Sequence, residues 1–289
     1  MNILITGSTG FIGKHLTTAL AGKHTLLTPT HKQLDLLDGD KVLTFFKKRP
    51  IDIVIHCAVI GGNRKDQYIE NMFYDNLRIF FNIVRCHKYF SRMINIGSGA
   101  EYDKRFPMKK VKEDDFGKHI PVDEYGFYKY ICASYINSSE DIVDLRVFGV
   151  FGEGEDYRHR FISNIICKNI WDLPIVMNQD LYFDYIDIRD VVKIIDHFIS
   201  HKPRYKAYNI GTGIQRSLKN IAFEINTIIP GQRKILIKKS GMGLEYTADI
   251  SRLKREIPFL RFTPFKRSIK DLYQWYLVRK KQIEPHSQV

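Results

Sequence analysis

The stretch that decides the fold is MNILITGSTGFIG (residues 1–13), in which a short apolar strand runs into a turn with glycines at positions 7, 10 and 13. The apolar spacing from Phe11 to Ala21 predicts a helix directly after this turn. This order is typical of a pyrophosphate site, because Gly7 permits the tight turn, Gly10 lets backbone amides approach phosphate, and Gly13 lets the helix pack closely on the strand. The helix N-terminus would face the anion. We therefore expect a dinucleotide to contact the turn and the first helical residues: Gly7, Ser8, Thr9, Gly10, Phe11, Ile12 and Gly13.

The composition is that of an ordinary globular protein: 289 residues, of which 44% are hydrophobic. Apolar runs fall well short of the roughly 18 residues needed to span a bilayer. Cys57, Cys86, Cys132 and Cys167 are scattered in apolar segments without paired spacing, which predicts buried free thiols and no metal site. The first strand starts at residue 2 and leaves no room for a signal peptide. We expect a cytoplasmic protein with no membrane partner.

The formal net charge of +13 requires an explanation. It could reflect a solvated lysine-rich surface, nucleic acid, an anionic membrane or small anionic ligands. The basic residues are spread along the chain, with the densest clusters at 104–112 and 253–281, and no base-reading module accompanies them. We therefore favour small anionic ligands, a dinucleotide and a nucleotide sugar, over nucleic acid.

Strand-like and helix-like segments alternate along the first half of the chain, which predicts parallel strands joined by helical crossovers. The expected fold is α/β, a doubly wound parallel sheet of the Rossmann type in residues 1–150, with part of 175–210 returning to it. Residues 151–289 would mainly form a smaller substrate lobe. The expected strands are 2–5, 25–28, 51–57, 93–96, 142–147, 175–176, 207–210 and 235–237. The expected helices are 11–21, 40–48, 67–87, 125–137, 161–170, 189–200 and 218–228.

A second chemical signal is the pair Tyr125 and Lys129, which share one face of a predicted helix. The ammonium could favour the phenolate and lower the pKa of the tyrosine from its reference value of roughly 10. Such a tyrosine exchanges protons with a substrate oxygen near neutral pH. Ser98 follows the predicted strand 93–96, at the carboxyl end where ligands bind in open parallel sheets.

The glycine turn, Ser98 and the Tyr125/Lys129 pair together resemble the short-chain dehydrogenase/reductase superfamily, and more narrowly its extended branch of sugar-nucleotide epimerases, dehydratases and reductases. Residues 183–191 (FDYIDIRDV) and 208–213 (YNIGTG) resemble further signatures of this branch. The resemblance implies that the adenine lies against Asp35 and Leu36. It also implies that the strand-end segment beside the cofactor includes Cys57, Ala58 and Val59, within residues 57–63. The most similar subfamily that we identify is GDP-L-fucose synthase.

The resemblance also assigns roles. NAD(P)H would give a hydride to a keto carbon of the sugar, usually C4, while Tyr125 delivers the proton, Ser98 hydrogen-bonds the developing alkoxide and Lys129 holds the nicotinamide ribose. Tyr125 and Lys129 thereby also belong to the cofactor site. A homodimer is expected. Substrate contacts are expected from four residues, Ser98, Gly99, Arg160 and Lys168.

Departures from the fucose synthase pattern narrow the prediction. Its cysteine two residues beyond the serine is Ala100 here, and its histidine corresponds to Arg160 with His159 alongside. Phe183 replaces an arginine, and Lys168 stands where an arginine meets the diphosphate. Since alanine cannot move a proton, we expect a 4-ketosugar reductase without C3/C5 epimerisation, acting in surface polysaccharide sugar biosynthesis. The alternatives are a bifunctional 3,5-epimerase/4-reductase, an NAD-dependent 4-epimerase and a non-enzymatic dinucleotide sensor.

The choice of cofactor depends on the end of the second strand, residues 28–32. A carboxylate there would hold the ribose diol of NAD, but the sequence TPTHK supplies hydroxyls and cations. His31 and Lys32 would satisfy a 2′-phosphate better. We expect NADP(H) to be preferred, with NAD(H) as the alternative.

Overall fold

A six-stranded parallel sheet organises the N-terminal domain. The structure is a computed structural model, and it describes residues 1–62 and 69–284. The strand order is β11-β6-β4-β3-β1-β2, and each neighbouring pair is parallel. This arrangement confirms the predicted fold class. The strands are β1 (Asn2–Thr6), β2 (Thr25–Leu27), β3 (Ile53–His56), β4 (Arg92–Ser98), β6 (Ile142–Val147) and β11 (Ala207–Ile210).

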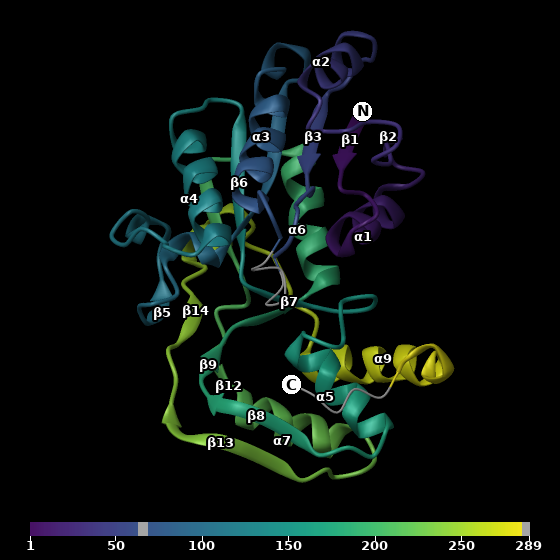
Figure 1. Cartoon of the computed structure of the whole chain (residues 1–289), viewed down its shortest axis with the longest axis vertical. Coiled ribbons are helices and arrows are strands. Elements are labelled where there is room, and N and C mark those ends of the chain that lie inside the picture. The colour runs from purple at the N-terminus through teal and green to yellow at the C-terminus, as the bar shows by residue number, and fades with distance from the viewer. Residues whose placement is uncertain (63–68, 285–289) are drawn as a thin grey trace.

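Helices cover both faces of this sheet (Figure 1). On one face lie α1 (Phe11–Leu20) and α6 (Ile188–Ser200), whose apolar residues pack against strand residues such as Ile3 and Ile5. Leu4 points to the other face and packs with α2 (Gly39–Lys47), α3 (Met72–Val84) and α4 (Glu124–Asn137). Because successive strand residues face opposite sides and both sides are covered, the strands are apolar throughout.

The second lobe has its own apolar core, formed by α5 (Phe161–Ile170), α7 (Leu218–Ile228) and α9 (Phe265–Val278) beside the parallel pair β8 (Ile175–Asp180) and β13 (Ile235–Met242). Short strands connect the lobes. They are β5 (Met108–Val111), β9 (Tyr182–Phe183), β12 (Arg216–Ser217) and β14 (Tyr246–Ala248) in one sheet, and β7 (Gly149–Phe151) with β10 (Tyr185–Asp187) in another.

The chain returns to the N-terminal domain after entering the second lobe. Strand β11 forms the edge of the large sheet, and α8 (Ser251–Glu256) packs beside it through Leu253. The Tyr208 hydroxyl on β11 donates a hydrogen bond to Glu256 at 2.7 Å. The single-turn 3-10 helices are η2 (His87–Tyr89), η3 (Gly99–Tyr102), η4 (Glu113–Asp115) and η5 (Lys280–Gln282).

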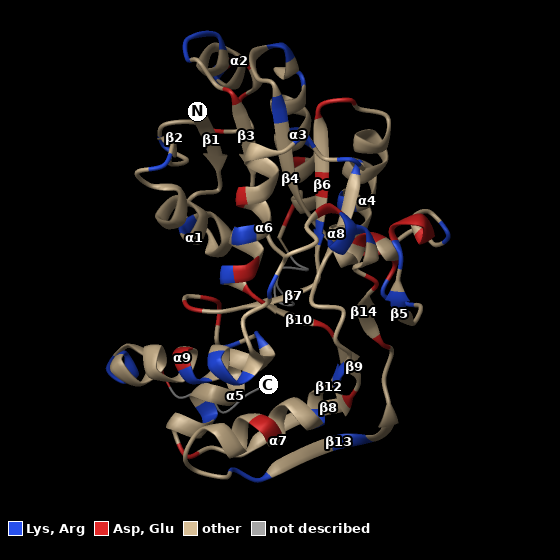
Figure 2. Ribbon diagram, turned by 180° about the vertical axis from the view of Figure 1, so that it is seen from behind, with Lys and Arg blue, Asp and Glu red and all other residues tan. Residues whose placement is uncertain are grey.

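Most elements lie where the sequence pattern places them, but their ends differ. The helix predicted from residue 67 begins at Met72, with 67 and 68 outside the described residues. Strands β8 and β13 are longer than predicted because they pair with each other over much of their length. Lys and Arg residues are distributed over elements of both lobes (Figure 2). Within residues 1–62 and 69–284, no helix has the length and apolar character needed to cross a membrane.

Candidate active site

The glycine turn after β1 is packed so tightly that no side chain fits at Gly7 or Gly13. Gly7 has φ of +65°, and a Cβ there would lie 2.7 Å from the backbone of Ala58. A Cβ on Gly13 would lie 2.8 Å from Ser8 Cα and closer still to the Gly7 carbonyl oxygen. The turn therefore packs directly on the segment that follows β3, which brings two of the predicted cofactor segments together.

The N-terminus of α1 is open to an anion. Its N-cap residue is Gly10, which supplies no capping side chain, and no acidic residue lies in the first turn. The N–H groups of Phe11 and Ile12 are therefore available at the positive end of the helix dipole. Ser8 is buried in the turn and Thr9 is exposed. This cradle fits the pyrophosphate of a dinucleotide.

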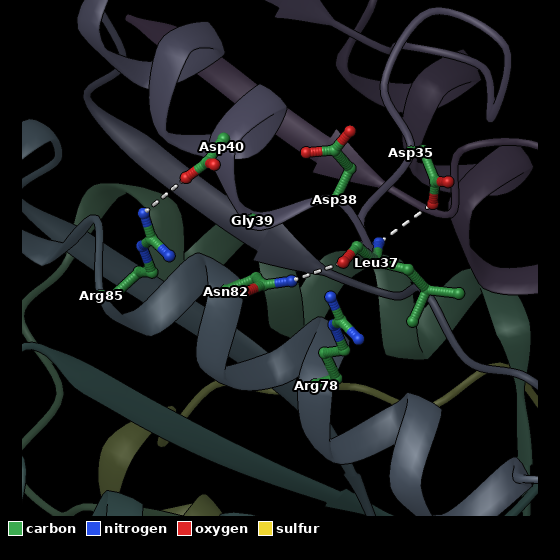
Figure 3. Close-up of a pocket in the computed structure, with 8 residues that line it drawn as sticks. All are labelled: Asp35, Leu37, Asp38, Gly39, Asp40, Arg78, Asn82 and Arg85. Atoms are coloured by element: carbon green, nitrogen blue, oxygen red, sulfur yellow. Dashed lines mark hydrogen bonds and ion pairs between the residues drawn. The ribbon is translucent and has the colours of Figure 1, made fainter.

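The predicted adenine end lies beside a polar pocket of about 470 Å³ between α3 and the loop that leads into α2 (Figure 3). Asp35 accepts the Leu37 N–H at 3.0 Å, and Asn82 donates to the Leu36 carbonyl at 2.8 Å, so the loop is held in place. Leu36 is partly buried against the neighbouring core. Arg78 extends from α3 toward this loop, and the sequence analysis did not identify it.

The segments at the ends of β2 and β3 differ in burial. His31 and Lys32 are exposed, and His31 Nδ1 lies 3.8 Å from the Asp35 carboxylate. Cys57 and Ala58 are partly buried and Val59 is exposed. Burial raises the pKa of the Cys57 thiol to about 12, so this cysteine is a packing residue rather than a nucleophile.

Ser98 lies at the end of β4 in a tightly bonded turn. Its Oγ accepts the Ala100 N–H at 3.1 Å, and its own N–H donates to Glu101 Oε1 at 2.8 Å. This reciprocal pattern is a capping box at the start of η3. Gly99 is buried in the same turn. The serine is therefore fixed both by its side chain and by its backbone.

Glu101 is itself part of a buried polar cluster. Its Oε2 lies 2.7 Å from Arg146 Nε, and both side chains are 1% exposed. Arg146 also donates to Asp144 at 3.2 Å and to the Tyr102 hydroxyl at 2.8 Å. Burial, followed by the charge of Asp144, raises the pKa of Glu101 well above its usual range. The S-x-x-E spacing of residues 98–101 was a sequence signal for this arrangement.

Tyr125 and Lys129 lie on α4, which starts at an Asp123 cap that accepts the Gly126 N–H at 2.9 Å. A Cβ on Gly126 would lie 2.9 Å from the Ala100 carbonyl oxygen, so this end of α4 packs directly on the serine turn. The Tyr125 ring is partly buried and lies against Gly62. The structure therefore places the tyrosine beside the serine turn.

Lys129 reaches between the ends of β3 and β4. Its buried ammonium donates to the Ile96 carbonyl at 2.6 Å. Its charge also acts on His56, whose pKa is lowered to about 3, mainly by burial and then by this lysine. The ammonium therefore lies beside β3, close to the segment that contacts the glycine turn.

Two of the four predicted substrate residues, Arg160 and Lys168, lie on α5 or its N-cap in the second lobe. Arg160 is the exposed N-cap of α5, and its neighbour His159 is paired with Asp156 at 2.6 Å between Nδ1 and Oδ2. Lys168 is 4% exposed, and no carboxylate of the described residues lies within ion-pair distance of it. Burial and the charge of Lys238 lower the pKa of Lys168. Lys238, on β13, is a nearby cation that the sequence analysis missed.

The two segments that resemble family signatures, residues 183–191 and 208–213, contact each other. The buried Asp184 accepts hydrogen bonds from the Thr212 N–H at 2.9 Å, the Thr212 hydroxyl at 2.6 Å and the Gly213 N–H at 2.8 Å. Phe183 stacks on Tyr246 of β14, with ring centroids 4.7 Å apart. These contacts fix the end of β11 against the short sheet that faces the serine turn.

The protein has a parallel sheet covered by helices and a glycine cradle for a dinucleotide. A serine, a tyrosine and a lysine lie at the carboxyl edge of the sheet. Together these features define an NAD(P)-dependent oxidoreductase or epimerase of the extended short-chain type. Residues 3–211 match the model of the NAD dependent epimerase/dehydratase family. The chain belongs to this family of sugar-nucleotide epimerases and reductases.

Curated relatives act on nucleotide sugars. The chain is 23% identical to GDP-6-deoxy-D-mannose reductase of Pseudomonas aeruginosa over 278 residues, covering 88% of this chain and 84% of the relative. It is 24% identical to ADP-L-glycero-D-manno-heptose-6-epimerase of Cupriavidus pinatubonensis over 272 residues, covering 81% and 80%.

Solved structures show the same fold. A GDP-mannoheptose C4 reductase from Campylobacter jejuni with NADP bound superposes with a TM-score of 0.82 at 20% identity, covering 95% of this chain and 98% of that one. A UDP-glucose 4-epimerase from Thermotoga maritima superposes with a TM-score of 0.83 at 17% identity, covering 98% and 100%. The relatives therefore include both reductases and epimerases.

Proposed function

We propose that this protein reduces the C4 keto group of a nucleotide-linked 4-keto-6-deoxy sugar with NADPH, without epimerisation at C3 or C5. The observation that carries the proposal is the packing of Tyr125 beside the Ser98 turn, with Lys129 held between the ends of β3 and β4. All three side chains lie at the edge of the sheet where the glycine turn also ends. Ligands bind at this edge in open parallel sheets.

Bound NADPH would supply a hydride to the keto carbon. Ser98 donates a hydrogen bond to the carbonyl oxygen, where negative charge develops, and one such preorganised donor is worth about 3 kcal/mol of barrier. Tyr125 transfers its phenolic proton to the same oxygen, which completes the alcohol. The Lys129 ammonium holds the ribose, and the transfer leaves Tyr125 as a phenolate. A solvent proton then restores the tyrosine.

Ala100 supports a reaction without epimerisation. Its side chain is a methyl group, 1% of the residue is exposed, and its N–H is bonded to Ser98. No acid or base is therefore available at this position to exchange protons with C3 or C5. His159, the other candidate, is paired with Asp156 through Nδ1, and solvent exchange at C3 and C5 tests whether its Nε2 acts on the sugar.

The preference for NADPH rests on the exposed cations at the end of β2. His31 and Lys32 are both exposed, and we expect them to meet a 2′-phosphate, His31 exchanging its 3.8 Å contact with Asp35 for the phosphate. A relative of the same fold was solved with NADP bound. Comparing kcat/KM for NADPH and NADH tests this preference, and a higher value with NADH would contradict it.

Lys168 and Arg160 are the proposed contacts to the substrate diphosphate, and Gly99 lines the sugar site with Ser98. The buried Lys168 has no acidic partner in the described part of the chain, which is unusual for a buried ammonium unless an anion binds there. A GDP-linked sugar is favoured because one curated relative is a GDP-6-deoxy-D-mannose reductase. We place the reaction in the cytoplasm, in the synthesis of sugars for surface polysaccharide.

The decisive experiment is to incubate the protein and NADPH with GDP-, dTDP-, UDP- and CDP-linked 4-keto-6-deoxy sugars and to follow cofactor oxidation. Oxidation with one of them identifies the reaction and the base together. Tyr125→Phe should bind NADPH normally and lose at least ~100-fold in kcat. Cofactor binding without turnover of any sugar by the wild type would instead favour a dinucleotide sensor.

Two further measurements separate reduction from epimerisation. Deuterium incorporated from solvent at C3 or C5 would contradict the proposal and favour the bifunctional 3,5-epimerase/4-reductase. A protein that purifies with tightly bound NAD and interconverts C4 epimers without added cofactor would favour the 4-epimerase. A reductase must release its cofactor after every turnover.

We also propose that the protein is a homodimer through α3 and α4. Both helices expose large aromatic side chains, among them Tyr74 and Phe81 on α3 and Phe127 and Tyr135 on α4. The Phe81 and Tyr135 rings contact each other across the two helices at 5.4 Å. Phe81→Glu should convert the dimer to a monomer in sedimentation, and a wild-type protein that sediments as a monomer would contradict this proposal.

A further inference from the structure

Tyr246 lies in the short sheet that connects the two lobes, and its hydroxyl lies against the serine turn. It begins β14, and its partly buried ring packs between Phe183, at a centroid distance of 4.7 Å, and Phe148, at 4.9 Å. A Cβ on Gly99 would lie 2.9 Å from Tyr246 Cζ and still closer to the hydroxyl oxygen. The hydroxyl therefore reaches Ser98 only because residue 99 is glycine.

The Tyr246 hydroxyl lies against Gly99, close enough to the Ser98 side chain for the two groups to interact. A serine hydroxyl has two acceptor lone pairs and one proton. Ser98 Oγ already accepts the Ala100 N–H at 3.1 Å, so one lone pair and the proton remain. If Tyr246 donates its proton to that lone pair, the serine proton is left for another acceptor. A bound ketone supplies this acceptor.

The surroundings keep the Tyr246 hydroxyl as a donor. Burial raises its pKa well above the usual range for tyrosine, and the charge of Tyr125 acts in the same direction, which outweighs the opposite effect of Ser98. The phenol of Tyr246 therefore stays protonated. The packing of the Tyr246 ring against Phe148 and Phe183 restricts the direction in which this hydroxyl can point.

We propose that Tyr246 is a positioning residue, whose hydroxyl donates to Ser98 Oγ and thereby directs the serine proton to the substrate carbonyl oxygen. This inference rests on the proposed role of Ser98. The donated hydrogen bond also makes the serine a stronger donor, since linked hydrogen bonds polarise one another. The sheet that connects the lobes thus orients the Ser98 hydroxyl, while the second lobe contributes to substrate binding.

The test is a cycle of four proteins: wild type, Ser98→Ala, Tyr246→Phe and the double variant. Tyr246→Phe keeps the ring and its packing and removes only the hydroxyl. It should lower kcat on the 4-keto sugar nucleotide about 10–100-fold, with the KM for NADPH unchanged. The double variant should have the same kcat as Ser98→Ala. Tyr276→Phe, a buried tyrosine of α9 in the core of the second lobe, is the matched control and should keep wild-type kcat.

A second measurement on the same four proteins does not depend on the substrate. Their melting temperatures should be non-additive, because each single variant already removes the hydrogen bond between the two hydroxyls. Additive losses in kcat, or additive shifts in melting temperature, would overturn the Tyr246 proposal. A wild type that reduces no keto sugar nucleotide, while the melting temperatures remain non-additive, would instead overturn the proposed function and leave the hydroxyl pair established.

Discussion

Replacing Glu101 by leucine tests how the serine turn is held. The substitution removes the acceptor of the Ser98 N–H, a hydrogen bond of 2.8 Å, and one of the two carboxyl groups beside Arg146. A buried N–H left without a partner costs about 1–3 kcal/mol. Removing one partner of a buried ion pair costs about 3–5 kcal/mol, and Asp144 remains to share the charge of Arg146. With Asp144 retaining about half of that ion-pair energy, the two losses together should lower the free energy of unfolding by about 3–5 kcal/mol.

Glutamine at position 101 gives an intermediate result. One oxygen of Glu101 receives the Ser98 N–H and the other faces Arg146, so either orientation of an amide places its NH₂ group against a donor. One unsatisfied group costs about 1–3 kcal/mol, less than the leucine variant. The expected order of stability is therefore wild type, Glu101→Gln, Glu101→Leu.

Urea unfolding at pH 7 and kcat at saturating NADPH are the measurements. The exposed Glu140→Leu is the control and should stay within about 0.5 kcal/mol of wild type. Glu101→Leu should also lower kcat by at least ~10-fold, because the serine loses its backbone anchor. A Glu101→Leu protein as stable and as active as the control would refute this account of the turn.

Three other perturbations have defined outcomes. Gly13→Ala should abolish NADPH binding in a fluorescence titration, since its Cβ would lie 2.8 Å from Ser8 Cα, and an unchanged Kd would contradict the role of the cradle. Lys32→Ala should raise the KM for NADPH about 5- to 10-fold and leave the KM for NADH unchanged, as expected for one charged contact to phosphate. Equal changes in both KM values would contradict a contact between Lys32 and the 2′-phosphate. Glu155→Gln concerns pH: burial raises the pKa of Glu155 from 4.5 to about 8, so wild-type stability falls as pH rises through this interval. The melting temperature of the glutamine variant relative to that of the wild type should be higher at pH 8.5 than at pH 5. The same difference at both pH values would exclude this explanation.

The regular part of the fold was predictable because its signals are local. The apolar spacing of residues 161–170 and 218–228 gives α5 and α7 with the observed ends. The short strands carry no such signal. Strand β14 has three residues, and its position is set by pairing with β5 and β9, which are distant in the chain. Tyr246 could therefore not be placed from the sequence.

The candidate site shows the same division between local and distant contacts. Ser98, Tyr125 and Lys129 are recognisable by their position after a strand and their spacing on a helix, and the structure brings them to one edge of the sheet. Arg146 and Tyr246 meet Ser98 or its turn only through tertiary contacts. Glu101 was not predicted, although the S-x-x-E spacing of residues 98–101 could have indicated a capping box.

The late return of the chain to the N-terminal domain affects how the enzyme matures on the ribosome. The cofactor turn at residues 7–13 is synthesised before β14 and α8, which emerge only after residue 245. A nascent chain could therefore form its dinucleotide cradle first, since domains tend to fold as they are synthesised. The serine turn would gain its Tyr246 partner only once β14 has been synthesised. Cofactor binding and catalytic competence would thus be acquired at different times in the life of the molecule.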